Sequence, residues 1–195
     1  IPAPGLQPGE TREIDLDTRG DKSNLRGGVS TTYYAAKQTR SATPFASSQK
    51  PVFVTADSAD IDNANETALY RGSARGWQEN NYVRADSLFI EQRSGRLTAE
   101  GNVQSTLFNA RSVTGGGATT PVNASAGTLV YERDARVVRL RTNVDVRQGN
   151  ERMTAGSADI LLDDNFEVVK TVAQTNVVVT QPGRRATGNS VEYTA

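Results

Sequence analysis

Three closely spaced aspartates, Asp57, Asp60 and Asp62, are the residues whose types and spacing most suggest chemistry. Neighbouring carboxylates could bind calcium or cleave a glycosidic bond. Asp60 and Asp62 flank the apolar Ile61, however, and this alternation is typical of a strand whose polar residues face water. The acidic pair does not recur at equivalent positions along the chain. We therefore favour a solvated face over a catalytic or metal site.

The composition removes most enzymatic chemistry. The 195 residues include no His and no Cys, which eliminates Ser-His-Asp triads, thiol nucleophiles, disulfides and the usual zinc sites. The 22 basic and 22 acidic residues balance, so there is no net charge to attract nucleic acid. No apolar run is long enough to cross a membrane. We expect a protein that is not an enzyme and that needs no cofactor, metal or nucleic-acid partner.

Trp77 is the single tryptophan. It could stack on a ligand or contact a membrane, although a partly buried residue at a strand end is the favoured interpretation. Tyr33 and Tyr34 leave the same alternatives open.

Two short patterns alternate along the chain and predict the fold. One is Ala or Gly followed two positions later by Ser or Thr, and the other is Gly or Thr flanked two positions away by small or apolar residues. The first begins at Ala56, Ala85, Ala126, Ala155 and Gly188, and the second is centred on Gly27, Gly72, Gly101, Thr142 and Thr175. Spacings of 16 and 13 residues recur between them, each three times, giving a basic period of 29. Such periods are typical of stacked supersecondary units.

Apolar residues recur with period two around both patterns, which indicates strands with one dry face and one wet face. The first pattern also contains a step of three residues between apolar positions, such as Ala56 to Ala59. This step would reverse the facing of the strand unless a bulge absorbs a residue, so we predict a bulge or bend at each of these sites.

The expected fold is all-β, with about eleven strands and no significant helix. Residues 11–195 are expected to form one domain, because Thr11 lies sixteen residues before Gly27 and begins a degenerate first unit. Residues 1–10, rich in proline, are expected to be an extended linker. Breaks in the spacing predict loop insertions near 35–50 and 109–120.

Two stretches resemble a known family. Residues 83–90 (VRADSLFI) and 97–103 (LTAEGNV) are similar to the Ala-Asp-x-Leu and Ala-x-Gly-Asn-Val motifs of the OstA-like, or LptA-like, proteins of lipopolysaccharide transport, and weaker copies extend the resemblance over 52–195. The resemblance implies a bent β-jellyroll shaped as a V-shaped trough, located in the periplasm after removal of a signal or anchor. It also implies that the trough carries the acyl chains of lipopolysaccharide or lipid A. The soluble bridge, the LptC-like tethered partner and the N-terminal domain of the LptD-like translocon all remain open.

The apolar residues expected on the dry face of the strands are the candidate lipid-binding residues, since an apolar groove favours acyl chains. These residues are Val54, Ile61, Val83, Leu88, Ile90, Leu97, Val103, Leu129, Val138, Leu140, Val144, Met153, Ile160, Val177 and Val179. The last strand, 186–195, is expected to leave its edge free for another OstA-like domain or for a second copy in head-to-tail association.

Two other classes of function compete with lipid transport. A structural or adhesive β-repeat protein of the cell envelope would have a filled interior and no lipid ligand. A carbohydrate-active enzyme would need carboxylates on the inward face, and the positions expected on the dry face of the strands contain none.

Overall fold

The computed structural model describes residues 13–17, 21–34, 50–107, 120–164 and 168–194, and in these residues it contains strands and no helix. The expected linker at 1–10 and most of both expected insertions lie outside the described residues. The strands are β1 (Glu13–Asp17), β2 (Lys22–Tyr33), β3 (Val52–Asp62), β4 (Thr67–Gln78), β5 (Asn81–Glu91), β6 (Arg96–Leu107), β7 (Val122–Glu132), β8 (Val137–Gln148), β9 (Glu151–Leu162), β10 (Val168–Gln181) and β11 (Arg184–Thr194).

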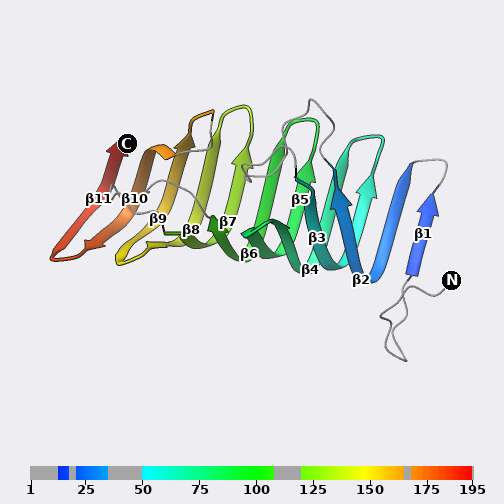
Figure 1. Ribbon diagram of the computed structural model, residues 1–195, viewed down its shortest axis with the longest axis horizontal. Coiled ribbons are helices and arrows are strands. Elements are labelled where there is room, and N and C mark those ends of the chain that lie inside the picture. The colour runs from blue at the N-terminus through cyan, green and yellow to red at the C-terminus, as the bar shows by residue number, and fades with distance from the viewer. Residues whose placement is uncertain (1–12, 18–20, 35–49, 108–119, 165–167, 195) are drawn as a thin grey trace.

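The strands form one sheet in chain order, and every neighbouring pair is antiparallel. Figure 1 shows them side by side in a row from blue β1 to red β11, with β1 and β11 at opposite ends. The predicted number of about eleven strands is confirmed. Because β1 and β11 do not pair with each other, the sheet stays open.

A sheet with no helix over it can bury one face only by folding onto itself, and the bend is built into every pair from β2 to β11. Between β4 and β5 the register shifts after Arg71, so that Gly72 and Ser73 oppose the single residue Asp86. Gly72 and Ser73 both have left-handed backbone, with φ of 79° and 47°. This geometry produces a bulge that sharpens the local twist and bend, and Figure 1 shows the long strands curving instead of lying flat.

The bulges lie at the predicted sites, but the prediction put the extra residue in the wrong strand. The two left-handed residues belong to the even-numbered strands, opposite the Ala/Gly-x-Ser/Thr pattern. They are Gly27–Gly28, Gly72–Ser73, Gly101–Asn102, Thr142–Asn143 and Thr175–Asn176. In the odd-numbered strands, the step of three residues between apolar positions spans the single residue that opposes each of these pairs.

The bulges divide the sheet into two leaves. Leaf A comprises 22–26, 58–62, 67–71, 87–91, 96–100, 128–132, 137–141, 157–162, 168–174 and 190–194, and leaf B comprises 29–33, 52–56, 74–78, 81–85, 103–107, 122–126, 144–148, 151–155, 177–181 and 184–188. The buried residues of both leaves form a single apolar cluster, so the leaves enclose one interior. The fold is a bent β-jellyroll.

At the bend, a glycine on one strand leaves room for a side chain on the neighbouring strand. A Cβ added at Gly72 would overlap the Asp57 carboxylate, and one at Gly101 would overlap Asp86. Further along, the order is reversed, because a Cβ at Gly127 would lie 2.9 Å from Thr142 Cβ. One at Gly156 would likewise lie 2.8 Å from Thr175 Cβ. Each of these four pairs therefore holds one side chain and one glycine, which explains how threonine replaces glycine at positions 142 and 175.

Carboxylates between two arginines hold the outer face together. Asp60 on β3 accepts hydrogen bonds from Arg26 on β2 and Arg71 on β4. Burial alone would raise the pKa of Asp60, but the hydrogen bonds from Arg71 and Arg26 hold it below its usual value.

Asp145 on β8 makes the same arrangement with Arg147 and Arg152, each at 2.8 Å. The hydrogen bond from Arg147, followed by that from Arg152, lowers the pKa of Asp145 to about 2. The polar face is thus largely neutralised within itself.

The pairing of a glycine with a side chain at the bend predicts strong coupling between positions 127 and 142. Gly127→Asp should destabilise the protein by about 2 kcal/mol, because the new side chain collides with Thr142. Thr142→Gly should change stability by less than about 1 kcal/mol, since it relieves left-handed threonine backbone but removes side-chain contacts. The double variant rebuilds the Asp57–Gly72 arrangement and should recover most of the loss in urea denaturation. Additive effects of the two substitutions would contradict this account of the bend.

Candidate functional site

The candidate site is the apolar interior between the leaves. All fifteen residues predicted to line it belong to this interior: Ile61 and Val179 are partly buried and pack against the cluster, and the others are buried members of it. The cluster runs from Val29 on β2 to Val177 on β10. The interior is therefore continuous along almost the whole sheet.

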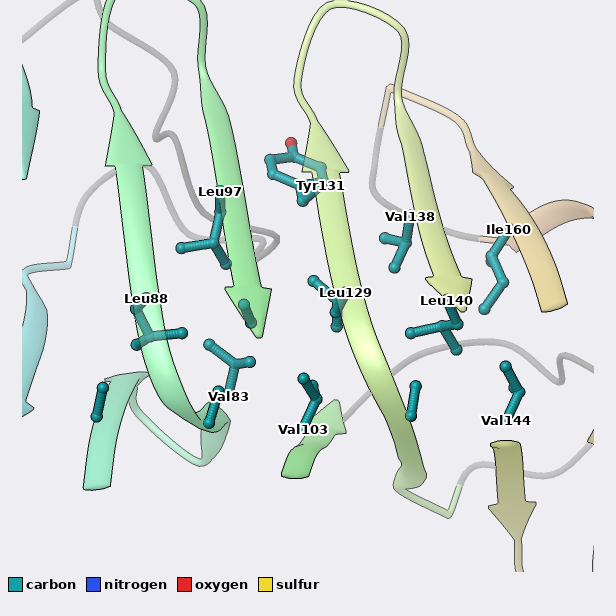
Figure 2. Packing of buried hydrophobic residues seen from close by; sticks show 14 of the residues in the cluster. Val83, Leu88, Leu97, Val103, Leu129, Tyr131, Val138, Leu140, Val144 and Ile160 are labelled. Carbon is teal, nitrogen blue, oxygen red and sulfur yellow. The ribbon is translucent and has the colours of Figure 1, made fainter. Parts of the chain in front are cut away.

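Neighbouring strands contribute side chains in rows. Figure 2 shows Leu88, Leu129 and Leu140 of leaf A in one row, with Val103 and Val144 of leaf B in a second row below them. The pairing register aligns the first row, because Leu88 and Leu129 both oppose Ala99, and Leu129 opposes Leu140. The small Ala99 lies between Leu88 and Leu129 in this row, and the small Ala158 follows Leu140.

Side chains, and not strand pairing, join the leaves across the interior. Leu88 of leaf A reaches leaf B, where its Cδ1 atom lies 3.7 Å from the position of a Cβ built on Gly76. Among the described strands, pairing and close backbone approach occur only between consecutive strands. Separating the leaves would therefore break no strand-to-strand hydrogen bond.

Several interior residues are absent from the predicted set. Tyr70 and Tyr131 are fully buried and are among its largest side chains. Val146 is also fully buried, and the period-two pattern that located Val144 would have located it. Gln78 and Gln148 are 1% exposed, and their side-chain amides donate to the carbonyl oxygens of Lys50 and Thr120. Both glutamines lie six residues after the first bulge residue of their strand, Gly72 or Thr142, so the repeat could have predicted them.

Three hydroxyl groups bridge the leaves near the β2 end of the interior. Tyr70 of leaf A lies 2.7 Å, oxygen to oxygen, from Thr31 and 2.5 Å from Tyr33, both of leaf B. Burial, followed by the proximity of Tyr70, raises the pKa of the Tyr33 hydroxyl far above its usual value. Burial likewise raises the pKa of Tyr70. This polar bridge is a latch between leaves that otherwise meet through apolar side chains.

The β11 end differs. The side chains of 184–190 are exposed, and Val191 and Tyr193 are only partly buried. Ala186, which the repeat placed with the inward residues, is exposed, because among the described strands β11 pairs with β10 alone. The side chains of 184–190 thus add nothing to the buried interior, whose last buried member is Val177 on β10.

Two of the three aspartates singled out in the sequence, Asp60 and Asp62, make contacts with other side chains. Asp60 pairs with two arginines, and Asp62 lies 3.6 Å from Lys22 and accepts a hydrogen bond from Asn65. Within the described residues, no group of three His, Cys, Asp or Glu residues could hold a metal ion. These residues also include no helix long and apolar enough to cross a membrane.

The middle of the chain matches a known protein family. Residues 53–143, from β3 to the bulge of β8, match the family model described as LptA/(LptD N-terminal domain) LPS transport protein. This stretch is similar to the LptA/LptD N-terminal domain family. Strands β9, β10 and β11 continue the same bulged pairing beyond the matched residues.

A solved structure supports the fold assignment. LptH from Pseudomonas aeruginosa, described as the LptA-homologous periplasmic component of the lipopolysaccharide transport device, aligns with a TM-score of 0.53 and 18% identity, over 71% of this chain and 94% of that chain. The likeness establishes that both proteins share the LptA-like fold. No match is found among proteins of curated function.

The hydroxyl latch predicts how Tyr70 contributes to stability. Tyr70→Phe should cost about 1–2 kcal/mol, because it keeps the ring but leaves the Thr31 and Tyr33 hydroxyls without this partner. Tyr34→Phe is the matched control, since Tyr34 is 80% exposed and should tolerate the change. The measurement is the free energy of unfolding from urea titrations. Equal effects of the two substitutions would show that the latch contributes nothing.

The same latch predicts a loss of stability in alkali. The folded state holds the Tyr33 and Tyr70 protons above the ordinary tyrosine pKa of 10.0, whereas the unfolded chain releases them. The folded protein therefore binds more protons above pH 10, and stability falls as the pH rises. Tyrosinate absorbance should show these two residues ionising only as the protein unfolds.

Proposed function

We propose that the chain is a non-enzymatic carrier that binds lipopolysaccharide in the periplasm, holds its acyl chains between the leaves and passes it along a conduit of OstA-like domains. The observation that supports this proposal most strongly is the continuous apolar interior of an open sheet in a domain similar to this transport family. The interior offers no carboxylate for catalysis among its buried residues.

The interior suits acyl chains energetically. Its lining is almost entirely aliphatic, and each methylene group that leaves water contributes about 0.8 kcal/mol. An acyl chain that buries ten methylenes therefore gains about 8 kcal/mol before the costs of association. Since the lining makes no directional demand on an acyl chain, one carrier can pass the lipid from row to row.

Entry of the lipid requires the leaves to part. Val54, Leu88 and Leu140 are at most 1% exposed, so their side chains fill the space that acyl chains would occupy. Parting the leaves costs apolar contacts, and bound acyl chains restore contacts of the same kind. The strand ladders remain intact because they run along the leaves and not across the interior. The bulges act as the hinge in this proposal.

Transfer needs continuity with a neighbouring domain. The free edge of β11 presents unpaired backbone groups, and edges of this kind accept an added strand. We propose that another OstA-like domain, or a second copy of this chain head to tail, extends the sheet there and prolongs the apolar interior.

A structural β-repeat of the cell envelope is the second candidate. The complete burial of the interior side chains favours it, because a filled interior needs no ligand. In that case amphiphiles would leave the stability of the protein unchanged.

Site-specific photocrosslinking distinguishes the two candidates. A photoreactive amino acid is placed at Leu140 or Val144, which face the interior, or at Arg139 or Arg141 of the same strand, which face outward. Purified variants are irradiated with labelled lipid A. The carrier proposal expects crosslinks from the two inward positions and at least tenfold fewer from the two outward positions.

The contrary outcomes are specific. Crosslinks from neither face, in variants whose circular dichroism shows an intact β-fold, would favour the structural protein. Equal crosslinking from both faces would indicate surface adsorption and would contradict transport through the interior.

A further inference from the structure

The outer face of leaf B carries a stack of aromatic rings around an arginine. Phe53 on β3 and Trp77 on β4 stack with centroids 5.5 Å apart and planes inclined by 22°. The Arg75 guanidinium carbon lies 5.3 Å from the Trp77 ring centroid and 5.1 Å from that of Tyr82 on β5. The three rings are half-buried, whereas Arg75 is exposed. The rings thus fix the guanidinium at the surface.

A second arginine lies beside the first. Arg84 on β5 directly opposes Arg75 in the pairing register, and it is also exposed. Like charges at directly opposed positions destabilise a sheet. Neither arginine forms an ion pair with any residue that the structure describes. The protein therefore retains an unfavourable pair of positive charges on an otherwise neutralised face.

The rest of the molecule shows how unusual this pair is. Each described lysine and arginine forms an ion pair, except Arg75, Arg84, and Arg184 and Arg185 on the edge strand β11. The chain has as many acidic as basic residues, yet no carboxylate of the described residues lies within ion-pair distance of Arg75 or Arg84.

The second half of the sheet provides an internal control. Seventy residues after Arg75, Trp77 and Tyr82 stand Asp145, Arg147 and Arg152, in the same pairing register on β8 and β9. Thr154 occupies the position equivalent to Arg84. There the central side chain is an anion held by two cations, and the group is complete. On β4 and β5 the central side chain is a cation held by two rings, and the anion is missing.

We propose that Arg75 and Arg84 form a binding site for a phosphate monoester. Arginine recognises phosphate through parallel N–H···O bonds, and a guanidinium already held between rings loses little freedom on binding. Two adjacent guanidiniums match the charge of about −2 that a phosphate monoester carries, whereas a single carboxylate supplies only half of it. The ligand completes on β4 and β5 the charge balance that Asp145 provides on β8.

The site lies on the outer face, so it is separate from the apolar interior and does not depend on lipid transport. A phosphate monoester could belong to a soluble sugar phosphate or to the headgroup of a membrane lipid. Both present the same dianion, and the experiment separates them by the form in which the phosphate is supplied.

The test measures binding of two probes to the complete chain. Glucose 1-phosphate is titrated in solution, with glucose as the neutral comparison, and phosphatidylcholine vesicles are compared with and without phosphatidic acid. The Arg75→Gln/Arg84→Gln variant should bind the phosphate probe at least tenfold more weakly, because it loses both charge-assisted contacts. The matched control is Arg184→Gln/Arg185→Gln, which removes the same charge and should bind as the wild type does. Trp77→Leu should weaken binding about threefold by freeing Arg75.

Each outcome has a meaning. Binding of glucose 1-phosphate that is lost only in the Arg75/Arg84 variant supports the site with a soluble source. Binding confined to phosphatidic acid vesicles and lost in the same variant supports it with a lipid source. Equal loss in both double variants would show a general charge effect and overturn the proposal, as would equally tight binding of a hexaglutamate peptide. Absence of binding in both arms would also overturn it.

A stability measurement guards against misfolding of the variant. Arg84→Thr introduces the residue found at the equivalent position 154 and removes the repulsion. It should leave the midpoint of thermal unfolding unchanged or raise it, while reducing phosphate binding. A lower midpoint would show that Arg84 serves the fold and would contradict the assignment.

Discussion

One sheet without helices must bury an apolar face, and the bend that achieves this is the constraint on which the structure depends. Each bend needs two consecutive residues with left-handed backbone opposite a single residue. Glycine adopts that backbone freely, whereas threonine does so at a cost. The chain tolerates Thr142 and Thr175 because Gly127 and Gly156 leave room for their side chains. The geometry that recurs along the chain lies in the pair of positions, and either member can be the glycine.

The repeat made the fold predictable. Recurring spacings of 16 and 13 residues located the strands, their inward faces and the sites of the bends. The strand that carries the extra residue was misassigned, because the period-two pattern breaks only in the odd-numbered strands. In the even-numbered strands the buried residues that flank the bulge, such as Tyr70 and Ala74, are four apart and keep the period. The hydroxyl contacts of Tyr33 and Tyr70 were also beyond prediction, since they join opposite leaves and depend on how closely these approach.

The cluster of aromatic and arginine side chains on the outer face could not be predicted from the sequence either. Arg75 and Trp77 lie two residues apart on β4, but their relation to Arg84 depends on the register between β4 and β5. Once the register is known, the comparison with Asp145 and its two arginines becomes possible. The same strand positions thus serve closure in one half of the sheet and, in our proposal, recognition in the other.

The interior is both the apolar core of the protein and the proposed lipid-binding site. A packed interior stabilises the ligand-free protein, while transport requires that packing to be exchangeable. The arrangement permits this exchange because hydrogen-bonded ladders run within the leaves, and apolar side chains meet between them. The hydroxyl latch near β2 and the exposed β11 make the two ends of the interior unequal.

The most direct test of this account is the distance between the leaf tips with and without lipid. Asn80 and Ser94 lie in the exposed turns at the two ends of β5, one on each leaf, and the chain has no cysteine to compete with labels placed there. Spin labels at Asn80→Cys and Ser94→Cys report their separation by pulsed electron resonance. The account predicts a single distance in the free protein and a longer one when lipid A is bound. An unchanged distance at saturating lipid A would contradict opening of the leaves.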